Sequence, residues 1–108
     1  MALFTECRAG QTETATWHRM ITTNEGEESR STQQPVDFWC SSVGASKTGK
    51  TFRDGLEGKQ YSAVIVSTNV SKLMGIEEGA QVVYRGARRN VVAVDFDPLR
   101  KLWTIALT

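Results

Sequence analysis

The chain has 108 residues, of which 40% are hydrophobic and 23% are charged, and its formal net charge is +1 at pH 7. This length suffices for one domain with one modest core, and the composition is that of an ordinary globular protein. The near-neutral charge excludes a strongly basic nucleic-acid-binding domain, so any contact with DNA must depend on local groups of basic residues.

The cysteine and histidine content predicts neither a disulfide framework nor a metal site. Cys7 and Cys40 lie far apart, no Cys-x-x-Cys spacing occurs, and the chain has one histidine, His18. No apolar run reaches the length of a signal peptide or a membrane span. We therefore expect reduced thiols, with Cys40 in the core, and a protein made in the cytoplasm without metal, cofactor or membrane contact.

The first elements predicted along the chain form a long β-hairpin. Residues 16–23, "TWHRMITT", and 36–43, "VDFWCSSV", are rich in strand-forming residues and flank the polar, glycine-containing break "NEGEESRS". The tip of this hairpin is acidic because it carries Glu25, Glu27 and Glu28. A solvated turn and a docking site for a partner both agree with that pattern.

The next segment, residues 44–58, is predicted to be a long, mobile and locally basic loop. It contains four glycines and three basic residues, Lys47, Lys50 and Arg53. These basic side chains are suited to phosphate contact and equally to simple solubility of the loop.

Within this loop, "GASKTGKT" matches the phosphate-binding pattern G-x-x-x-x-G-K-[ST], and "VVAVD", ending at Asp95, resembles the magnesium-holding strand of nucleotide-binding proteins. Such a site also requires a helix directly after the motif. Gly55 and Gly58 each disfavour that helix by about 1 kcal/mol relative to alanine. The strand before the motif is too polar for a central parallel strand, and no β-α-β crossover is found. Nucleotide binding is therefore kept only as a less favoured alternative.

The second half of the chain predicts short strands separated by turns. In "KQYSAVIVST" the continuous apolar stretch 63–66 indicates either burial on both faces of the sheet or a tightly curved sheet. "NVSKLMG" is expected to form one helical turn, with Asn69 or Ser71 as N-cap and Gly75 as terminator. "AQVVYRG" and "RNVVAVDF" then form two strands around the turn "RGAR".

The last predicted strand is "KLWTIAL", in which Trp103, Ile105 and Leu107 face one way. We expect Trp103 to pack inside the protein with Ile105 and Val83. Five or six such strands without a long helical pattern predict an all-β fold. The expected architecture is one small β-barrel domain over residues 1–108, mostly antiparallel, with one long loop (44–58) and at most one short helix.

In this strand order the chain resembles the head-closure, or head–tail joining, proteins of long-tailed bacteriophages. The run "GIEEGAQVVYRGARRNVVAVDFDPLRKLWTIAL" carries the resemblance most clearly, through a glycine turn, a "V-x-Y-x-G" hairpin, a polar break and a final apolar strand. The resemblance extends from Trp17 to Leu107. Its closest matches are Gly79, Val83, Tyr84, Arg85 and Gly86.

The resemblance implies a structural virion protein without enzymatic activity. Such a subunit forms a homo-oligomeric ring in the neck, below the portal or adaptor ring, closes the DNA-filled head and offers the surface to which a tail terminator or tail completion protein attaches. It also implies that residues 44–58 point toward the channel, where Lys47, Lys50 and Arg53 lie near double-stranded DNA. The basic group Arg85, Arg88 and Arg89 and the acidic tip Glu25, Glu27 and Glu28 are candidates for subunit or partner contacts.

A second alternative is a small barrel that binds single-stranded nucleic acid by stacking bases on aromatic side chains. Trp17, Trp39 and Trp103 are the residues this function would need exposed. All three fall within apolar strand patterns, which favours core or interface positions.

Overall fold

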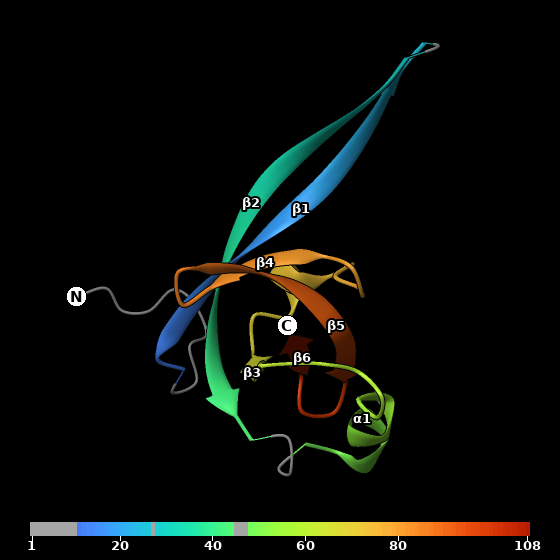
Figure 1. The fold of residues 1–108 in the computed structure, drawn as a ribbon. Helices are drawn as coiled ribbons and strands as arrows, with labels where there is room; N and C mark the ends of the chain where they lie inside the picture. The colour runs from blue at the N-terminus through green and yellow to red at the C-terminus, as the bar shows by residue number, and fades with distance from the viewer. Residues whose placement is uncertain (1–10, 27, 45–47) are drawn as a thin grey trace, which may run out of the picture.

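The computed structural model describes residues 11–26, 28–44 and 48–108 of the chain, which form a closed barrel of six antiparallel strands (Figure 1). Around the barrel the strands follow the order β1-β2-β3-β6-β5-β4. Their bounds are β1 Glu13–Glu25, β2 Glu28–Val43, β3 Ala63–Ser67, β4 Gln81–Tyr84, β5 Ala87–Asp97 and β6 Leu102–Leu107. The predicted all-β barrel is confirmed, since every strand pair among the described residues is antiparallel.

Two short helical segments accompany the strands, α1 (Lys50–Gly55) and the 3-10 turn η2 (Ser71–Leu73). The expected helical turn in "NVSKLMG" is therefore present, and Gly75 follows it with a φ of 90°. Neither helix formed by the described residues has the length and apolar character needed to cross a membrane.

The interior of the barrel is filled by side chains that alternate along the strands. Trp103 and Ile105 lie in it as expected, and the Trp103 ring packs against Phe96 with 4.8 Å between ring centroids. The expected contact with Val83 was wrong: Val82 and Tyr84 are the β4 residues that face inward. A shift of one position in a strand moves a side chain to the opposite face.

The segment 44–58, predicted to be a loop, contains α1 and therefore differs from the expectation. Phe52 of α1 and Leu56, the C-cap residue of this helix, are buried against a small apolar patch on the outer face of the barrel. That patch is formed by Val64, Ala93 and Ala106. Tertiary burial of this pair outweighs the low helix propensity of the glycine-rich segment, as commonly happens for short helices.

A β-bulge in β5 explains how this strand contributes side chains both to the barrel interior and to the apolar patch under α1. The register of β5 on β6 shifts between Val91 and Ala93. Val91 lies in the interior, whereas Ala93 lies under α1 on the outer face; beyond the bulge, Val94 and Phe96 pack toward the interior. The extra residue of a bulge reverses the alternation of side chains, and here it divides "VVAV" between the interior and the α1 patch.

The turns on either side of β5 are stabilised by their own residues. Arg85 and Gly86 connect β4 to β5 with φ values of 51° and 75°, the positive values of a tight two-residue hairpin turn. Between β5 and β6, the Asp97 carboxylate accepts hydrogen bonds from the backbone N–H groups of Leu99 (3.0 Å) and Arg100 (3.2 Å). This side-chain-to-backbone pattern fixes the turn.

Where the β2–β3 ladder ends, side chains continue the hydrogen bonding. The backbone N–H of Trp39 donates to Oδ1 of Asn69 (2.7 Å), and Oγ of Ser67 donates to the Trp39 carbonyl (2.6 Å). Asn69 therefore binds β2 and does not cap η2, whose N-cap residue is Val70.

Candidate functional site

The hairpin of β1 and β2 extends well beyond the barrel as an arm (Figure 1). We define the arm as residues 19–35. At its base, β1 pairs with β4 only from Ala15 to His18, and β2 pairs with β3 only from Ser41 to Val43. Beyond these positions the two arm strands pair only with each other. The arm thus presents two open strand edges, one of which is interrupted by Pro35.

Most arm side chains are polar and exposed, and the strongest apolar exposure is that of Met20, at 56%. At the tip, Gly26 turns the chain with a φ of 63°. Glu28 is exposed and forms a 3.9 Å ion pair with Arg30. Glu27 and the side chain of Glu25 lie outside what the structure describes. The predicted long hairpin is confirmed, and its partner contacts remain a prediction.

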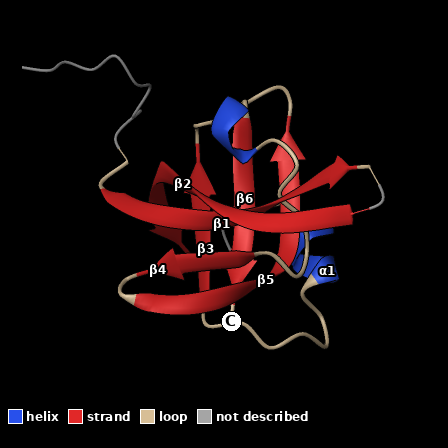
Figure 2. Ribbon diagram, turned by 90° about the horizontal axis from the view of Figure 1, so that it is seen from above, coloured by secondary structure: helices blue, strands red, loops and turns tan. Residues whose placement is uncertain are grey.

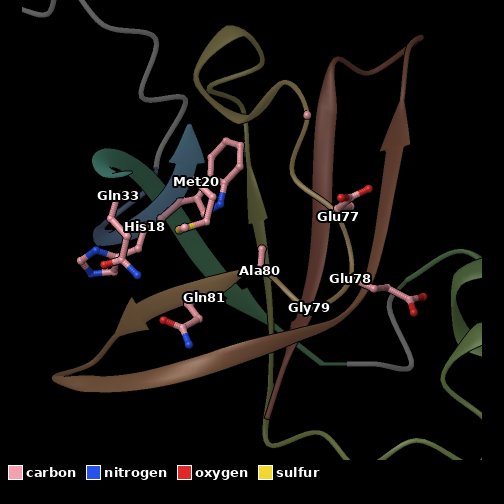
Figure 3. Close-up of a pocket in the computed structure, with 10 residues that line it drawn as sticks. His18, Met20, Gln33, Glu77, Glu78, Gly79, Ala80 and Gln81 are labelled. Carbon is pink, nitrogen blue, oxygen red and sulfur yellow. The ribbon is translucent and has the colours of Figure 1, made fainter. Parts of the chain in front are cut away.

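A hollow of about 420 Å³ lies between the base of the arm and the segment 75–81 (Figure 3). One wall is formed by Trp17, His18 and Met20 of β1, and the other by the segment that contains Glu77 and Glu78, whose side chains point away from β1 (Figure 3). Figure 2 shows from above that β1 passes across the barrel with β4 beside it.

The two carboxylates differ in their partners. Glu78 pairs with Lys59, whose Nζ lies 2.8 Å from Oε1 of Glu78 and also donates to the Val92 carbonyl at 2.9 Å. Glu77 is exposed and makes no ion pair within the described part of the chain. Of the two, Glu77 is therefore the carboxylate without an ion pair among the described residues.

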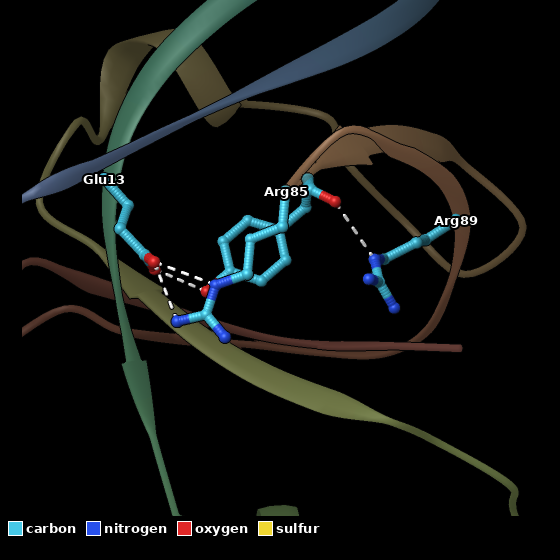
Figure 4. Close-up of polar contacts among 4 residues, drawn as sticks. Glu13, Arg85 and Arg89 are labelled. Atoms are coloured by element: carbon cyan, nitrogen blue, oxygen red, sulfur yellow. Dashed lines mark hydrogen bonds and ion pairs between the residues drawn. The ribbon is translucent and has the colours of Figure 1, made fainter.

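A polar cluster at the far end of β4, at Tyr84, contains two of the three predicted arginines, Arg85 and Arg89 (Figure 4). The hydroxyl of Tyr84 donates to Oε2 of Glu13, and Nε of Arg85 donates to Oε1 of the same carboxylate at 2.8 Å. Arg89 donates to the Tyr84 carbonyl (3.2 Å) and to the Thr108 carbonyl (3.1 Å). The guanidinium groups of Arg85 and Arg89 both lie over the Tyr84 ring, at 5.1 and 5.8 Å from its centroid.

This cluster shifts the pKa values of its members. The hydrogen bond from Tyr84, followed by the contact with Arg85, lowers the pKa of Glu13, although partial burial opposes this. Burial, followed by the hydrogen bond to Glu13, raises the pKa of Tyr84 to about 12. Burial is also the main cause that raises the pKa of the neighbouring Cys40 thiol to about 12, so the expected core position of Cys40 is confirmed.

The third arginine, Arg88, donates from Nη1 to Oε1 of Gln81 at 3.2 Å. All three predicted arginines therefore have partners within their own chain. The carboxylate that pairs with Arg85 is that of Glu13, a residue that no sequence motif indicates. No local signal identifies it, because Glu13 and Tyr84 are 71 residues apart.

The basic residues predicted to face a channel lie at or near α1. Arg53 is exposed on this helix, Lys47 lies outside the described residues, and so does the side chain of Lys50. In Figure 1 this segment lies at the end of the barrel away from the arm tip. Whether it approaches DNA remains a prediction.

Two residues required by the nucleotide-binding alternative do come together. Thr51 and Asp95 line one hollow of about 140 Å³, which Lys59 and Glu78 share. This volume is well below the roughly 300–1,000 Å³ of typical ligand sites. In addition, α1 has six residues and follows an antiparallel strand, whereas a phosphate loop needs a longer helix after a parallel strand. Within the described residues, no three His, Cys, Asp or Glu side chains are grouped so that they could hold a metal ion.

Comparison of the chain with models of protein families, with curated proteins and with solved structures finds no match to any of them.

Proposed function

We propose that this chain is a structural neck protein of a long-tailed bacteriophage, without enzymatic activity. In this proposal its copies form a ring below the portal or adaptor, close the DNA-filled head and provide the surface to which the tail attaches. The proposal begins from the sequence resemblance of residues 75–107 and adds to it the architecture of the barrel.

The observation that carries the proposal is the structural role of the residues that match the family pattern. Gly79 and Gly86 have φ values of 91° and 75°, which favour glycine, and the side chain of Tyr84 is buried. The matched run contains the glycine that terminates η2 and the strands β4, β5 and β6. These three strands form half of the six-stranded barrel wall. The residues on which the proposal rests therefore form consecutive strands of this barrel, which supports the proposal.

The shape of the subunit suits a place between two partners. The arm leaves the barrel at one end, and the α1 segment lies at the other (Figure 1). A two-stranded hairpin is at best marginally stable in water by itself. An arm with open edges gains stability when a neighbouring molecule covers it, which agrees with a subunit that functions in an assembly.

The same geometry disfavours the single-stranded nucleic-acid alternative. Trp17 and Trp103 are only 5% and 8% exposed, and the indole N–H of Trp103 is used by the Val70 carbonyl at 3.2 Å. Base stacking needs accessible ring faces. The barrel uses these two rings for its own packing.

The direct test is reconstitution. Purified protein is added to DNA-filled, tailless phage heads that carry a portal, and the particles are imaged by cryo-electron microscopy. We expect one additional ring of density below the portal, slower loss of DNA and a gain in tail attachment. Failure to bind any portal, adaptor or tail-terminator protein would contradict the proposal.

A second measurement separates the nucleotide-binding alternative. Calorimetry with Mg²⁺–ATP and Mg²⁺–GTP is expected to give no binding. Clear binding that disappears in Lys50→Ala would instead favour a phosphate-loop function.

A further inference from the structure

The strand register of the arm fixes which backbone groups lie on its two open edges. The N–H and the carbonyl of Trp39 bind Asn69 and Ser67, on the side of β2 away from β1. Because backbone groups alternate in direction along a strand, the odd-numbered residues of β2 all point theirs away from β1. Their partners in the register are the even-numbered residues of β1, which point their groups away from β2.

At the base of the arm, the even-numbered β1 residues up to His18 pair with β4. The next three, Met20, Thr22 and Asn24, lie beyond the end of this pairing and are exposed. Each of them directs one N–H and one carbonyl outward from the arm. We call residues 20–24 of β1 the open edge.

The β2 edge of the arm is protected against pairing, whereas the open edge is not. Pro35 occupies an odd-numbered position of β2, so the N–H that it lacks falls on the outer edge and the β1–β2 ladder loses no hydrogen bond. Proline in this position is a common means of preventing the addition of another strand. The open edge has no proline, and Ile21, Thr22 and Thr23 within it are β-branched residues that favour strands.

The open edge is complementary to a second copy of itself. When two open edges run antiparallel about a two-fold axis at Thr22, Met20 of each copy lies opposite Asn24 of the other. All the outward N–H and carbonyl groups are then used, because each of these residue pairs exchanges two hydrogen bonds. The same register places Arg19 of each copy opposite Glu25 of the other, and opposite charges in such cross-strand positions are stabilising.

Other arrangements of the same edges are less favourable. An axis at Met20 would place Thr22 opposite His18, whose backbone groups already bind β4. Pairing of the open edge with the β2 edge of another arm, in the register of the hairpin itself, would place Glu25 opposite Glu28. Like charges directly opposite each other are destabilising. The axis at Thr22 uses every outward group and places no like charges opposite each other.

We propose that two copies of this protein form a dimer by pairing the open edges of their arms antiparallel, so that the sheet of one arm continues into the other. In Figure 1 the arm projects away from the barrel, which leaves its edges accessible to a second arm. The contact is isologous and closes on itself as a dimer, whereas a ring needs head-to-tail contacts. The dimer is therefore a state of the free protein, and the inference goes beyond the proposed function.

Disulfide cross-linking tests the position of the axis. Thr22→Cys is made in a Cys7→Ser background, in which the remaining Cys40 is buried. Residues directly opposite each other in a hydrogen-bonded pair have Cα atoms about 5.5 Å apart, which is within the range of a disulfide. We expect Thr22→Cys to form a disulfide-linked dimer under mild oxidation. Ser31→Cys is the matched control and should stay uncross-linked, because Ser31 is exposed and lies opposite Thr22 in the same arm, on the β2 edge.

Other cross-linking patterns overturn the proposal. Cross-linking of Ser31→Cys with itself indicates pairing through the β2 edges. Cross-linking that occurs mainly in a mixture of the two variants indicates that β1 of one arm pairs with β2 of the next. The absence of dimers from all these samples shows that the open edge does not pair with a second copy.

Proline substitution tests the backbone hydrogen bonds. Thr22→Pro removes an outward N–H from the open edge, and Ser31→Pro removes the outward N–H directly across the arm. Neither N–H serves the β1–β2 ladder. In sedimentation velocity over a range of concentrations, we expect the wild-type protein and Ser31→Pro to dimerise and Thr22→Pro to stay monomeric. Equal behaviour of the two proline variants, or a wild-type protein that is monomeric at every concentration, overturns the inference.

Charge reversal provides an independent measurement that leaves the backbone unchanged. Arg19→Glu is expected to weaken dimerisation by about tenfold at low salt. Adding Glu25→Arg to the same chain is expected to restore dimerisation, because the reversed pair is again complementary. A double variant that dimerises as weakly as Arg19→Glu contradicts the register.

These results are separable from those that test the proposed function. A protein that dimerises through the open edge and adds no ring to phage heads retains this contact and loses the proposed function. A protein that adds a ring to heads, while Thr22→Cys forms no dimer, retains the proposed function and loses this contact.

Discussion

Replacing Phe52 with alanine is expected to detach α1 from the barrel and leave the barrel folded. The Phe52 side chain is 6% exposed and, with Leu56, makes the apolar contact of α1 with the outer face of the barrel. A helix of six residues is far below the roughly 12–15 residues at which isolated helices become even marginally stable. The docked state of α1 therefore depends on these two side chains.

The expected loss is about 2–3 kcal/mol, the value for exposing one large apolar side chain. This loss of stability is smaller than the loss expected when a phenylalanine deep in a core is replaced by alanine. The reason is that α1 lies outside the barrel wall, so water fills the space left by the Phe52 ring and no closed cavity remains. A change of this size raises the population of the detached state by about 30- to 150-fold. Global unfolding should change much less than this local equilibrium.

Limited trypsin digestion measures the detached state directly, because the bond after Arg53 lies within α1. When the helix opens and closes faster than cleavage occurs, the cleavage rate follows the open population. We expect cleavage after Arg53, identified by mass spectrometry, to be at least about 30-fold faster in Phe52→Ala. Thr51→Ala, an exposed neighbour on the same helix, is the control. An unchanged rate in Phe52→Ala, or loss of the whole barrel together with α1, would refute the reasoning.

Three further predictions concern the barrel. Trp103→Ala should lower the free energy of unfolding by about 3–5 kcal/mol in urea titrations, because a large interior side chain is removed; an unchanged midpoint would mean that the ring does not support the core. Gly86→Ala should cost about 1–2 kcal/mol in the same assay because its φ is 75°, whereas Gly55→Ala, at the end of α1, should be neutral or slightly stabilising. Stability should fall as the pH rises from about 9 toward 12, because folding raises the pKa values of Cys40 and Tyr84 to about 12 and the native state then holds protons that the unfolded state has lost. Denaturant titrations along this pH range should show a shallower fall in Tyr84→Phe, and an equal fall in both proteins would contradict the assignment.

The strands of the barrel could be predicted from sequence because their signals are local. Alternating apolar residues in "KLWTIAL", the continuous apolar stretch in "SAVIVS" and the turn "RGAR" each depend on neighbouring residues alone, and the structure places β6, β3 and the β4–β5 turn there. The sequence also predicted that the segments of β1 and β2 form a hairpin. Its length was underestimated, because polar cross-strand pairs continue it through "NEGEESRS", a stretch that composition alone assigns to a loop.

The candidate surfaces could be predicted from the sequence only in part. The acidic tip and the arginines were identifiable as charged groups, but their contacts were not, because Glu13 meets Tyr84 and Arg85 only when β1 lies beside β4. The hollow likewise joins Met20 with Glu77 and Glu78 from distant parts of the chain.

The sequence by itself determined that this protein is a small antiparallel β-barrel, because strand periodicity and turn chemistry act over a few residues and leave no alternative element long enough to compete. Only the tertiary structure decided that "GASKTGKT" leads into a helix on the outside of a barrel. Phe52 and Leu56 are buried against a patch that exists only after β3, β5 and β6 pair and bring Val64, Ala93 and Ala106 together. The bulge in β5 turns Ala93 toward this patch. A helix held by contacts between distant strands has no signal in its own residues.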